Sequence, residues 1–295
     1  ILQLLKIYVC RLMGAKMSTE HLLLVGLLKK LKDDALVLPT LPEVAMRVQE
    51  VVSRSDASLK QVGEVIGQDA AISARIIKVA NSALYSRGIP AESISSAVSR
   101  IGLIQIKSIA TSVAMEQLFI STNEMVWEVM DEVWRTSIDV TAAACAMLQM
   151  YNKRRPGQLN LDTLTLAGLV HNIGALPVLT EAEAHPELFT SIDQLRSLVR
   201  KMQGPLGRAV LKSWDFAPEV MEVVERWADL PYLPDHVTYL DFIRAAAFYT
   251  GELRAGADFE QRMDVFVGRG LPVSANDLAS DEFMDKFHSI KESYQ

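Results

Sequence analysis

Apolar residues recur at helical spacing through most of the chain. From 44 to 52 they fall at Val44, Val48, Val51 and Val52, which form one face of a helix. No segment alternates apolar and polar residues strongly enough to predict a strand, and no repeat of fixed period occurs. The pattern therefore predicts an all-α, multi-helical protein. Beyond residue 120, the predicted helices cover 123–150, 161–170, 192–202, 205–212, 218–227 and 238–254.

Polar residues at capping positions predict where the N-terminal helices begin. The segment Thr40–Glu43 has the spacing of a capping box, in which a hydroxyl and a carboxylate bind the free amide groups of the first turn. Ser58 with Gln61 has the same spacing. Asp69 is expected to cap the next helix, and helices resume at Ser93 after a loop. Each of these residues precedes an apolar helical face.

Glycine and proline predict the main interruptions. Gly102 separates two short helices at a tight turn. The segments 86–90 and 152–157 combine Gly and Pro and are predicted loops. Near the C-terminus, Gly and Pro between 268 and 272 predict a loop before a last amphipathic helix.

Composition narrows the class of protein. The 295 residues are 49% apolar and 22% charged, which is typical of one large or two modest globular domains. A net charge of −6 argues against a general nucleic-acid binder. Cys10 and Cys145 lack metal-binding spacing, which suits a reducing compartment. The apolar stretches 1–12 and 22–28 are too short to cross a membrane and no signal-peptide cleavage site follows them, so we expect a cytoplasmic protein without a membrane partner.

Four motifs resemble the HDOD family. They are LPTLPEV at 38–44, GQDAAISAR at 67–75, VANSALY at 79–85 and AGLVHNIG at 167–174, and the resemblance extends from about 36 to about 227. It implies an N-terminal helical subdomain packed on a degenerate HD-type helical bundle, in bacterial regulatory proteins that usually lack enzyme activity. On this basis we divide the chain into N-terminal amphipathic helices, the N-terminal subdomain, the HD-like bundle, and a C-terminal loop and helix, at 1–31, 32–120, 121–255 and 256–295.

The resemblance also identifies the positions where an HD phosphohydrolase holds its metal. Such an enzyme needs a first His, a His-Asp pair and a distal Asp, because divalent cations prefer several carboxylate or imidazole ligands. Ser137 matches the first His, and His171-Asn172 matches the pair. Asp241 lies about one turn from the expected distal position at 245–246, and Gln203 matches a His of better-preserved relatives, as does the segment 226–227. One imidazole among these positions predicts a vestigial site with no metal or other cofactor and no catalytic residue.

Other titratable residues have simpler interpretations. His171 is expected to be a buried histidine bound to neighbouring side chains or backbone. Glu181, Glu183 and His185 would bring Glu181 and His185 onto one helical face, but the polar surroundings and Pro186 favour a solvated surface.

The segment from 70 to 110 is basic and contains one acidic residue, Glu92. The simpler interpretation is that these basic residues are solvated or form intramolecular ion pairs. The alternative is that they contact an anionic ligand or nucleic acid. The basic residues of this possible ligand or partner region are Arg75, Lys78, Arg87, Arg100 and Lys107.

Three functions remain open. The favoured one is a non-catalytic signal-transduction module that binds a protein partner, a neighbouring signalling domain or a small nucleotide. A residual metal-dependent phosphohydrolase, with a divalent metal at His171 and Asp241, is the first alternative. A nucleotide or nucleic-acid sensor is the second, although the acidic composition makes nucleic acid a poor partner.

Overall fold

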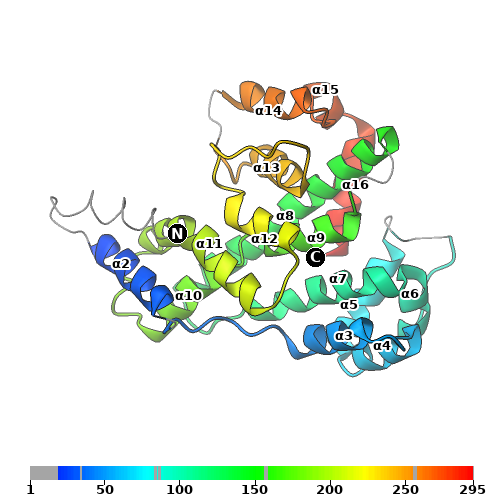
Figure 1. The fold of residues 1–295 in the computed structure, drawn as a ribbon, viewed down its shortest axis with the longest axis horizontal. Coiled ribbons are helices and arrows are strands. Elements are labelled where there is room, and N and C mark those ends of the chain that lie inside the picture. Colours follow the sequence, from blue (N-terminus) through cyan, green and yellow to red (C-terminus); the bar gives the residue numbers. More distant parts are fainter. Residues whose placement is uncertain are drawn as a thin grey trace.

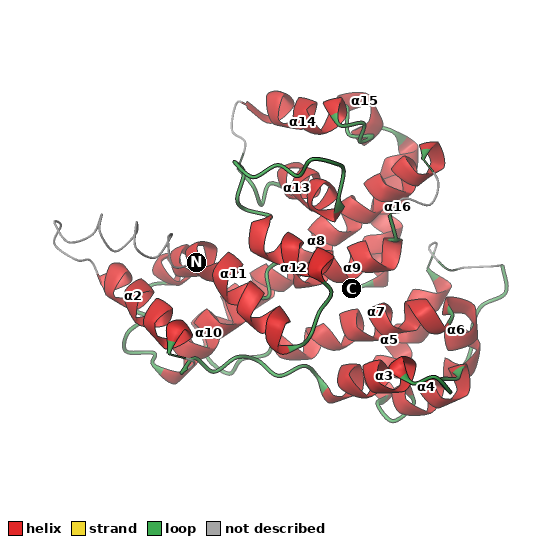
Figure 2. Ribbon diagram, in the orientation of Figure 1, coloured by secondary structure: helices red, strands yellow, loops and turns green. Residues whose placement is uncertain are grey.

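The structure is a computed structural model that describes residues 19–33, 35–82, 85, 88–155, 159–254 and 258–294. Figure 2 shows helices joined by loops, and the described residues contain no strand. The all-α prediction is confirmed. The predictions for Cys10, for Arg87 and for most of the stretch 1–31 lie outside the described residues.

The N-terminal subdomain is built from α3 to α7, grouped at the lower right of Figure 1. Ser58, Asp69 and Ser93 cap their helices as predicted, and Gly102 makes the turn between α6 and α7 with φ of 93°. The helices are α3 (Glu43–Ser53), α4 (Leu59–Ile66), α5 (Ala70–Asn81), α6 (Ile94–Ile101) and α7 (Leu103–Ala114), followed by a 3-10 turn, η1 (Met115–Leu118).

The predicted capping box at Thr40–Glu43 is wrong. The N-cap position of α3 is Pro42, and no side chain caps the helix. Proline disfavours helical backbone in the residue before it, so Leu41 cannot begin the helix and Thr40 lies too far upstream to cap it.

The HD-like bundle is organised around α8, which packs against α9, α13 and α16. Its helices are α8 (Glu124–Arg154), α9 (Leu161–Val170), α10 (Ala175–Ala184), α11 (Ile192–Ser213), α12 (Pro218–Arg226) and α13 (Tyr239–Thr250). The helix α2 (Thr19–Lys32) packs on α11, at the left of Figure 1.

Three predicted boundaries differ from the structure. Helix α8 continues to Arg154, beyond the predicted start of the loop at 152. Helix α11 runs through Pro205 without a break, because its apolar face stays buried on both sides of the proline and this packing outweighs the missing hydrogen bond. Helix α13 ends at Thr250, short of 254, because Gly251 takes the left-handed conformation with φ of 83°.

The two subdomains are held together by residues of the sequence motifs. Tyr85 donates a hydrogen bond to Asp162 at the start of α9. Burial raises the pKa of the Asp162 carboxyl, and the hydrogen bond from Tyr85 partly opposes that shift. Trp214 Nε1, just after α11, donates to Pro39 O at 2.9 Å. Helices α7 and α9 also pack directly together.

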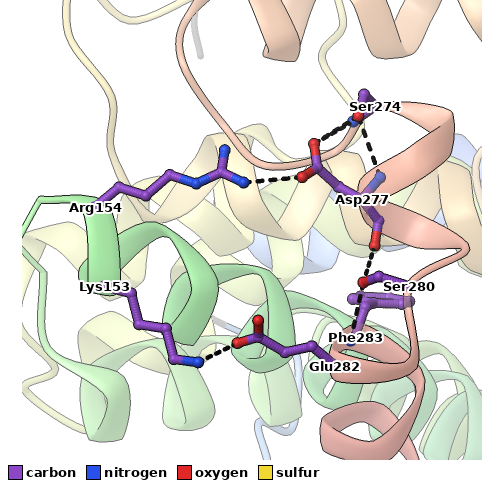
Figure 3. Close-up of polar contacts among 7 residues, drawn as sticks. All are labelled: Lys153, Arg154, Ser274, Asp277, Ser280, Glu282 and Phe283. Carbon is purple, nitrogen blue, oxygen red and sulfur yellow. Dashed lines mark hydrogen bonds and ion pairs between the residues drawn. The ribbon is translucent and has the colours of Figure 1, made fainter.

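The C-terminal segment contacts the C-terminal end of α8 and contains more helix than the sequence predicts. Helix α14 precedes the expected loop at 268–272. Figure 3 shows Arg154 bound to Asp277 at 3.0 Å and Lys153 bound to Glu282, so ion pairs join α8 to α15 and α16. The helices are α14 (Phe259–Gly268), α15 (Ala275–Leu278) and α16 (Asp281–Ser293).

Among the described residues, the stretch Leu161–Ala184 is long and apolar enough to cross a membrane by length and composition. It forms α9 and α10, and 83% of its most apolar window is buried within the fold. The core position of these helices accounts for their apolar character.

Candidate functional site

The turn between α9 and α10 carries His171 and Asn172 into the centre of the bundle. Gly168 lies against α8, where a Cβ atom would come within 2.5 Å of Thr141 Oγ1. Gly174 lies against α11, where a Cβ atom would come within 1.9 Å of Gln203 O. These glycines of the AGLVHNIG motif therefore let the turn fit closely between two helices.

Both ring nitrogens of His171 have partners. The side chain is fully buried, with Nδ1 2.5 Å from Gly168 O and Nε2 2.9 Å from Glu252 Oε2. A carbonyl oxygen only accepts hydrogen bonds, so Nδ1 carries a proton and donates. The edge of the imidazole packs against Trp227, with ring centroids 4.8 Å apart. The expectation of a buried histidine bound to its neighbours therefore agrees with this geometry.

Glu252 is the residue that the sequence analysis missed. Its Oε1 accepts a hydrogen bond from Asn172 Nδ2 at 2.6 Å, so one carboxylate binds both members of the His-Asn pair. The left-handed Gly251 ends α13 and turns the chain so that Glu252 enters the bundle. A glycine that follows a helical stretch is a common stop signal, and it could have placed Glu252 in the loop after the helix.

A cavity of about 570 Å³ opens beside this pair, between α8, α11 and the end of α13. Asn172 and Gln203, both more than nine-tenths buried, contribute polar walls. Asn172 Oδ1 is buried and has no hydrogen-bond partner. The charged side chains that line the cavity are Glu132, Arg196, Arg200, Glu252 and Arg254. We call this space the His171 cavity.

Two of the predicted vestigial positions, Ser137 and Asp241, do not line the cavity. Ser137 is fully buried in α8, and its hydroxyl donates to Val133 O at 2.9 Å within the same helix. Asp241 lies at the opposite end of α13 from Glu252. It forms a capping box with Thr238 and an ion pair with Arg269 at 2.7 Å. Asn172 and Gln203 thus line the cavity and His171 lies buried beside it, while Ser137 and Asp241 make the helix and capping contacts described above.

The donors around His171 do not fit a divalent metal ion. Histidine ligands commonly donate one ring N–H to a carbonyl and leave the other nitrogen for the metal, but here Glu252 faces that second nitrogen. Asn172 turns its amide nitrogen, which cannot bind a cation, toward the same carboxylate. Within the described part of the chain, no group of three or more His, Cys, Asp or Glu side chains could hold a metal.

The basic segment of the N-terminal subdomain is largely committed to internal contacts. Arg75 pairs with Glu116 at 2.6 Å. Arg100 donates to Ala80 O at 3.2 Å and to Asn81 Oδ1 at 2.8 Å, and it also binds Ile89 O. Lys78 and Lys107 are exposed, and Arg87 lies outside the described residues.

The acidic cluster near 181–185 does not form a shared helical face. His185 is the residue after α10, where the helix ends. Glu181 pairs with Lys30 of α2 at 2.6 Å, and Glu183 accepts a hydrogen bond from Ser121 at 2.8 Å. These carboxylates attach neighbouring segments to α10.

The protein is an all-α protein with a buried His-Asn turn at the centre of a helical bundle. Comparison of the sequence with known families refines this class. The chain belongs to the HDOD domain family, which matches residues 38–229. Glu252 and Arg254 lie beyond that match.

Several solved structures are similar. A protein from Shewanella amazonensis SB2B, named as a candidate metal-dependent phosphohydrolase, is 85% identical over 95% of this chain and 100% of that chain, with a TM-score of 0.92. An HDOD domain protein of unknown function from Geobacter sulfurreducens is 21% identical, covering 91% and 97%, with a TM-score of 0.61. A candidate signal transduction protein from Marinobacter aquaeolei VT8 is 18% identical, covering 96% and 66%, with a TM-score of 0.56.

Among curated proteins, the chain is 23% identical over 229 residues to an uncharacterized protein of Treponema pallidum (strain Nichols). The match covers 74% of this chain and 42% of that protein.

Proposed function

We propose that this chain is a non-catalytic regulatory module of the HDOD family that acts by binding a protein partner or a small ligand. The observation that carries the proposal is the pairing of His171 Nε2 with Glu252 at 2.9 Å. A nitrogen that faces a carboxylate at hydrogen-bond distance is not available to a metal, and Ser137 binds its own helix. The signal-transduction name of the Marinobacter structure supports a regulatory role.

The test is a hydrolysis assay on the purified protein with Mn²⁺, Mg²⁺ or Fe²⁺, using a nucleoside monophosphate and a cyclic dinucleotide as substrates. We expect no turnover above that of buffer with metal. Metal-dependent hydrolysis that disappears in His171→Ala and persists in His185→Ala would refute the proposal. His185 is a matched control because it is partly exposed and lies outside the His171 cavity.

A residual metal-dependent phosphohydrolase remains the second candidate. Its support is the name of the 85% identical Shewanella protein. It requires Glu252 to leave His171 or to become a ligand itself. Glu252→Gln separates these two routes, because it should abolish hydrolysis that uses Glu252 as a ligand and should preserve hydrolysis for which Glu252 only has to move away from His171.

A nucleic-acid sensor has less support. The arginines of the basic segment that the structure describes already bind Glu116 and backbone carbonyls. A cytoplasmic location and a protein partner stay predictions of the sequence.

A further inference from the structure

Two arginines that line the His171 cavity have no partner among the residues that the structure describes. Arg200 and Arg254 line the cavity, and neither makes an ion pair or hydrogen bond with another described residue. Arg196 differs, since it pairs with Glu128 at 3.0 Å and also binds Glu132. Arg200 and Arg254 are therefore the two guanidinium groups of the cavity that are available to a ligand.

The acidic residues that line the cavity bind other residues and do not pair with Arg200 or Arg254, and the three arginines and two glutamates of the lining sum to a net charge of +1. Glu132 binds Arg196, and Glu252 binds His171 and Asn172. Guanidinium groups match the planar oxygen pairs of phosphates and carboxylates. Two such groups on one cavity can each bind one charged group, or one pair of oxygen atoms, of a small anion.

The wall of the cavity also contains two side-chain amides, those of Asn172 and Gln203. Asn172 is 3% exposed, its Nδ2 is bound to Glu252, and its Oδ1 has no partner. A buried acceptor without a donor is costly, and buried polar groups nearly always have a partner. Gln203 lines the same cavity and is 7% exposed. Asn172 Oδ1 is buried behind the wall, so the Gln203 amide is the group that hydroxyl or amino groups on a ligand would contact.

We propose that the His171 cavity binds a small dianionic metabolite, either a phosphate monoester or a dicarboxylate, that also carries hydroxyl or amino groups. Arg200 and Arg254 bind the charged groups, and the Gln203 amide forms a hydrogen bond with a hydroxyl or amino group of the ligand. A volume of about 570 Å³ is within the usual range of small-molecule sites. This inference rests on the proposed regulatory function, because the ligand is bound and released unchanged.

Calorimetric titration of the full chain with ribose 5-phosphate, malate and ribose tests the proposal. Ribose 5-phosphate and malate represent the two sources of a hydroxylated dianion, and ribose has hydroxyl groups without charge. We expect saturable binding of one or both dianions and none of ribose. Arg200→Gln and Arg254→Gln should each weaken binding roughly tenfold or more, since each removes a charge-assisted contact.

Lys212→Gln is the matched control. It removes one positive charge from an exposed position on the same helix, α11, outside the cavity, and it should leave the affinity within about twofold. Arg200 and Arg254 are exposed, so thermal unfolding of their variants should match that of the wild type.

Two results would overturn the proposal: no saturable binding of either dianion, or binding that Arg200→Gln and Arg254→Gln leave unchanged. Because metal-dependent hydrolysis is measured separately, the failures are distinguishable. Absence of both binding and hydrolysis removes this inference alone, whereas release of phosphate from ribose 5-phosphate that depends on His171 removes the regulatory function as well.

Discussion

The arginines of the N-terminal subdomain and those of the His171 cavity differ in where their hydrogen bonds go. Arg75 and Arg100 bind a carboxylate and backbone carbonyls of their own subdomain. Arg200 and Arg254 line a cavity and bind no described residue. Sequence composition favours the first group as a basic region, but the geometry favours the second as a binding site. Local charge is therefore a poor guide to a ligand site unless the partners of each cation are known.

The largest effect is expected at Arg244, a third internally bound arginine, which is buried in α13 of the bundle. It is 2% exposed and donates to Trp227 O at 3.2 Å, to Arg226 O at 2.7 Å, and to Asp229 O and Tyr232 O. Arg244→Met should lower the free energy of unfolding by roughly 3 kcal/mol or more, because it leaves several carbonyls unpaired.

Urea unfolding followed by circular dichroism measures this effect of Arg244→Met. Arg262→Met, at an exposed position of α14, is the control and should change stability by less than about 0.5 kcal/mol. Equal stability of the two variants would show that the buried guanidinium does not hold the loop between α12 and α13.

Arg100→Ala should have the next largest effect. Its guanidinium joins the end of α5 to the loop before α6, so its loss should lower the free energy of unfolding by about 2 kcal/mol. Lys78→Ala removes an exposed cation from the same segment and should have almost no effect on stability. If Arg100→Ala instead left stability unchanged and abolished ligand binding, the assignment of the two groups would be reversed.

Glu252→Gln tests the contact at His171 directly. The glutamine amide keeps the shape of the side chain but removes its negative charge, so its hydrogen bonds with Asn172 and His171 should be weaker. We therefore expect the free energy of unfolding to fall by about 1 to 2 kcal/mol. Glu187→Gln is the control, because Glu187 is exposed and lies 3.5 Å from His185. Unchanged stability in Glu252→Gln would mean that Glu252 does not hold the His-Asn pair.

The ion pairs at the C-terminal segment predict a smaller, acid-dependent effect. Hydrogen bonds from Lys153 lower the pKa of Glu282. Burial by itself would raise the pKa of Asp277, but hydrogen bonds from Ser274 and Arg154 outweigh it, and the pKa is lowered. Carboxyl groups with lowered pKa values stabilise the folded state above their unfolded pKa values of about 4, and this stabilisation is lost as the pH falls through the folded values.

The double variant Lys153→Ala/Arg154→Ala should therefore be less stable than the wild type at pH 7 and should approach it below about pH 3.5. Thermal unfolding across this pH range measures the difference between the two proteins. A difference that stays constant with pH would contradict the role of these ion pairs.

Much of the fold could be predicted because it depends on local interactions. Ser58, Asp69 and Ser93 cap helices through contacts within three residues, and α9 begins and ends at its predicted residues. Predictions of helix boundaries failed where an adjacent proline or tertiary packing outweighed the local sequence signal. Pro42 shifted the start of α3, and packing carried α11 through Pro205.

The candidate site could be predicted only in part. The His-Asn pair was found because it belongs to a motif, and Gln203 meets it at the cavity. Glu252 lies 81 positions from His171 and beyond the family match, so neither spacing nor resemblance indicates their contact. For the same reason, the sequence does not show which arginines are paired within the fold. The partners of Arg75 and Arg196, Glu116 and Glu128, lie far from them along the chain.

The metal content of the protein, purified from cells without chelators, tests the central claim most directly. If the Glu252 carboxylate takes the place of a metal ion at His171 Nε2, elemental mass spectrometry should find Fe, Mn and Zn far below one ion per chain. This result should be the same for the wild type and for His171→Ala. One ion per chain in the wild type that is lost in His171→Ala would contradict this account.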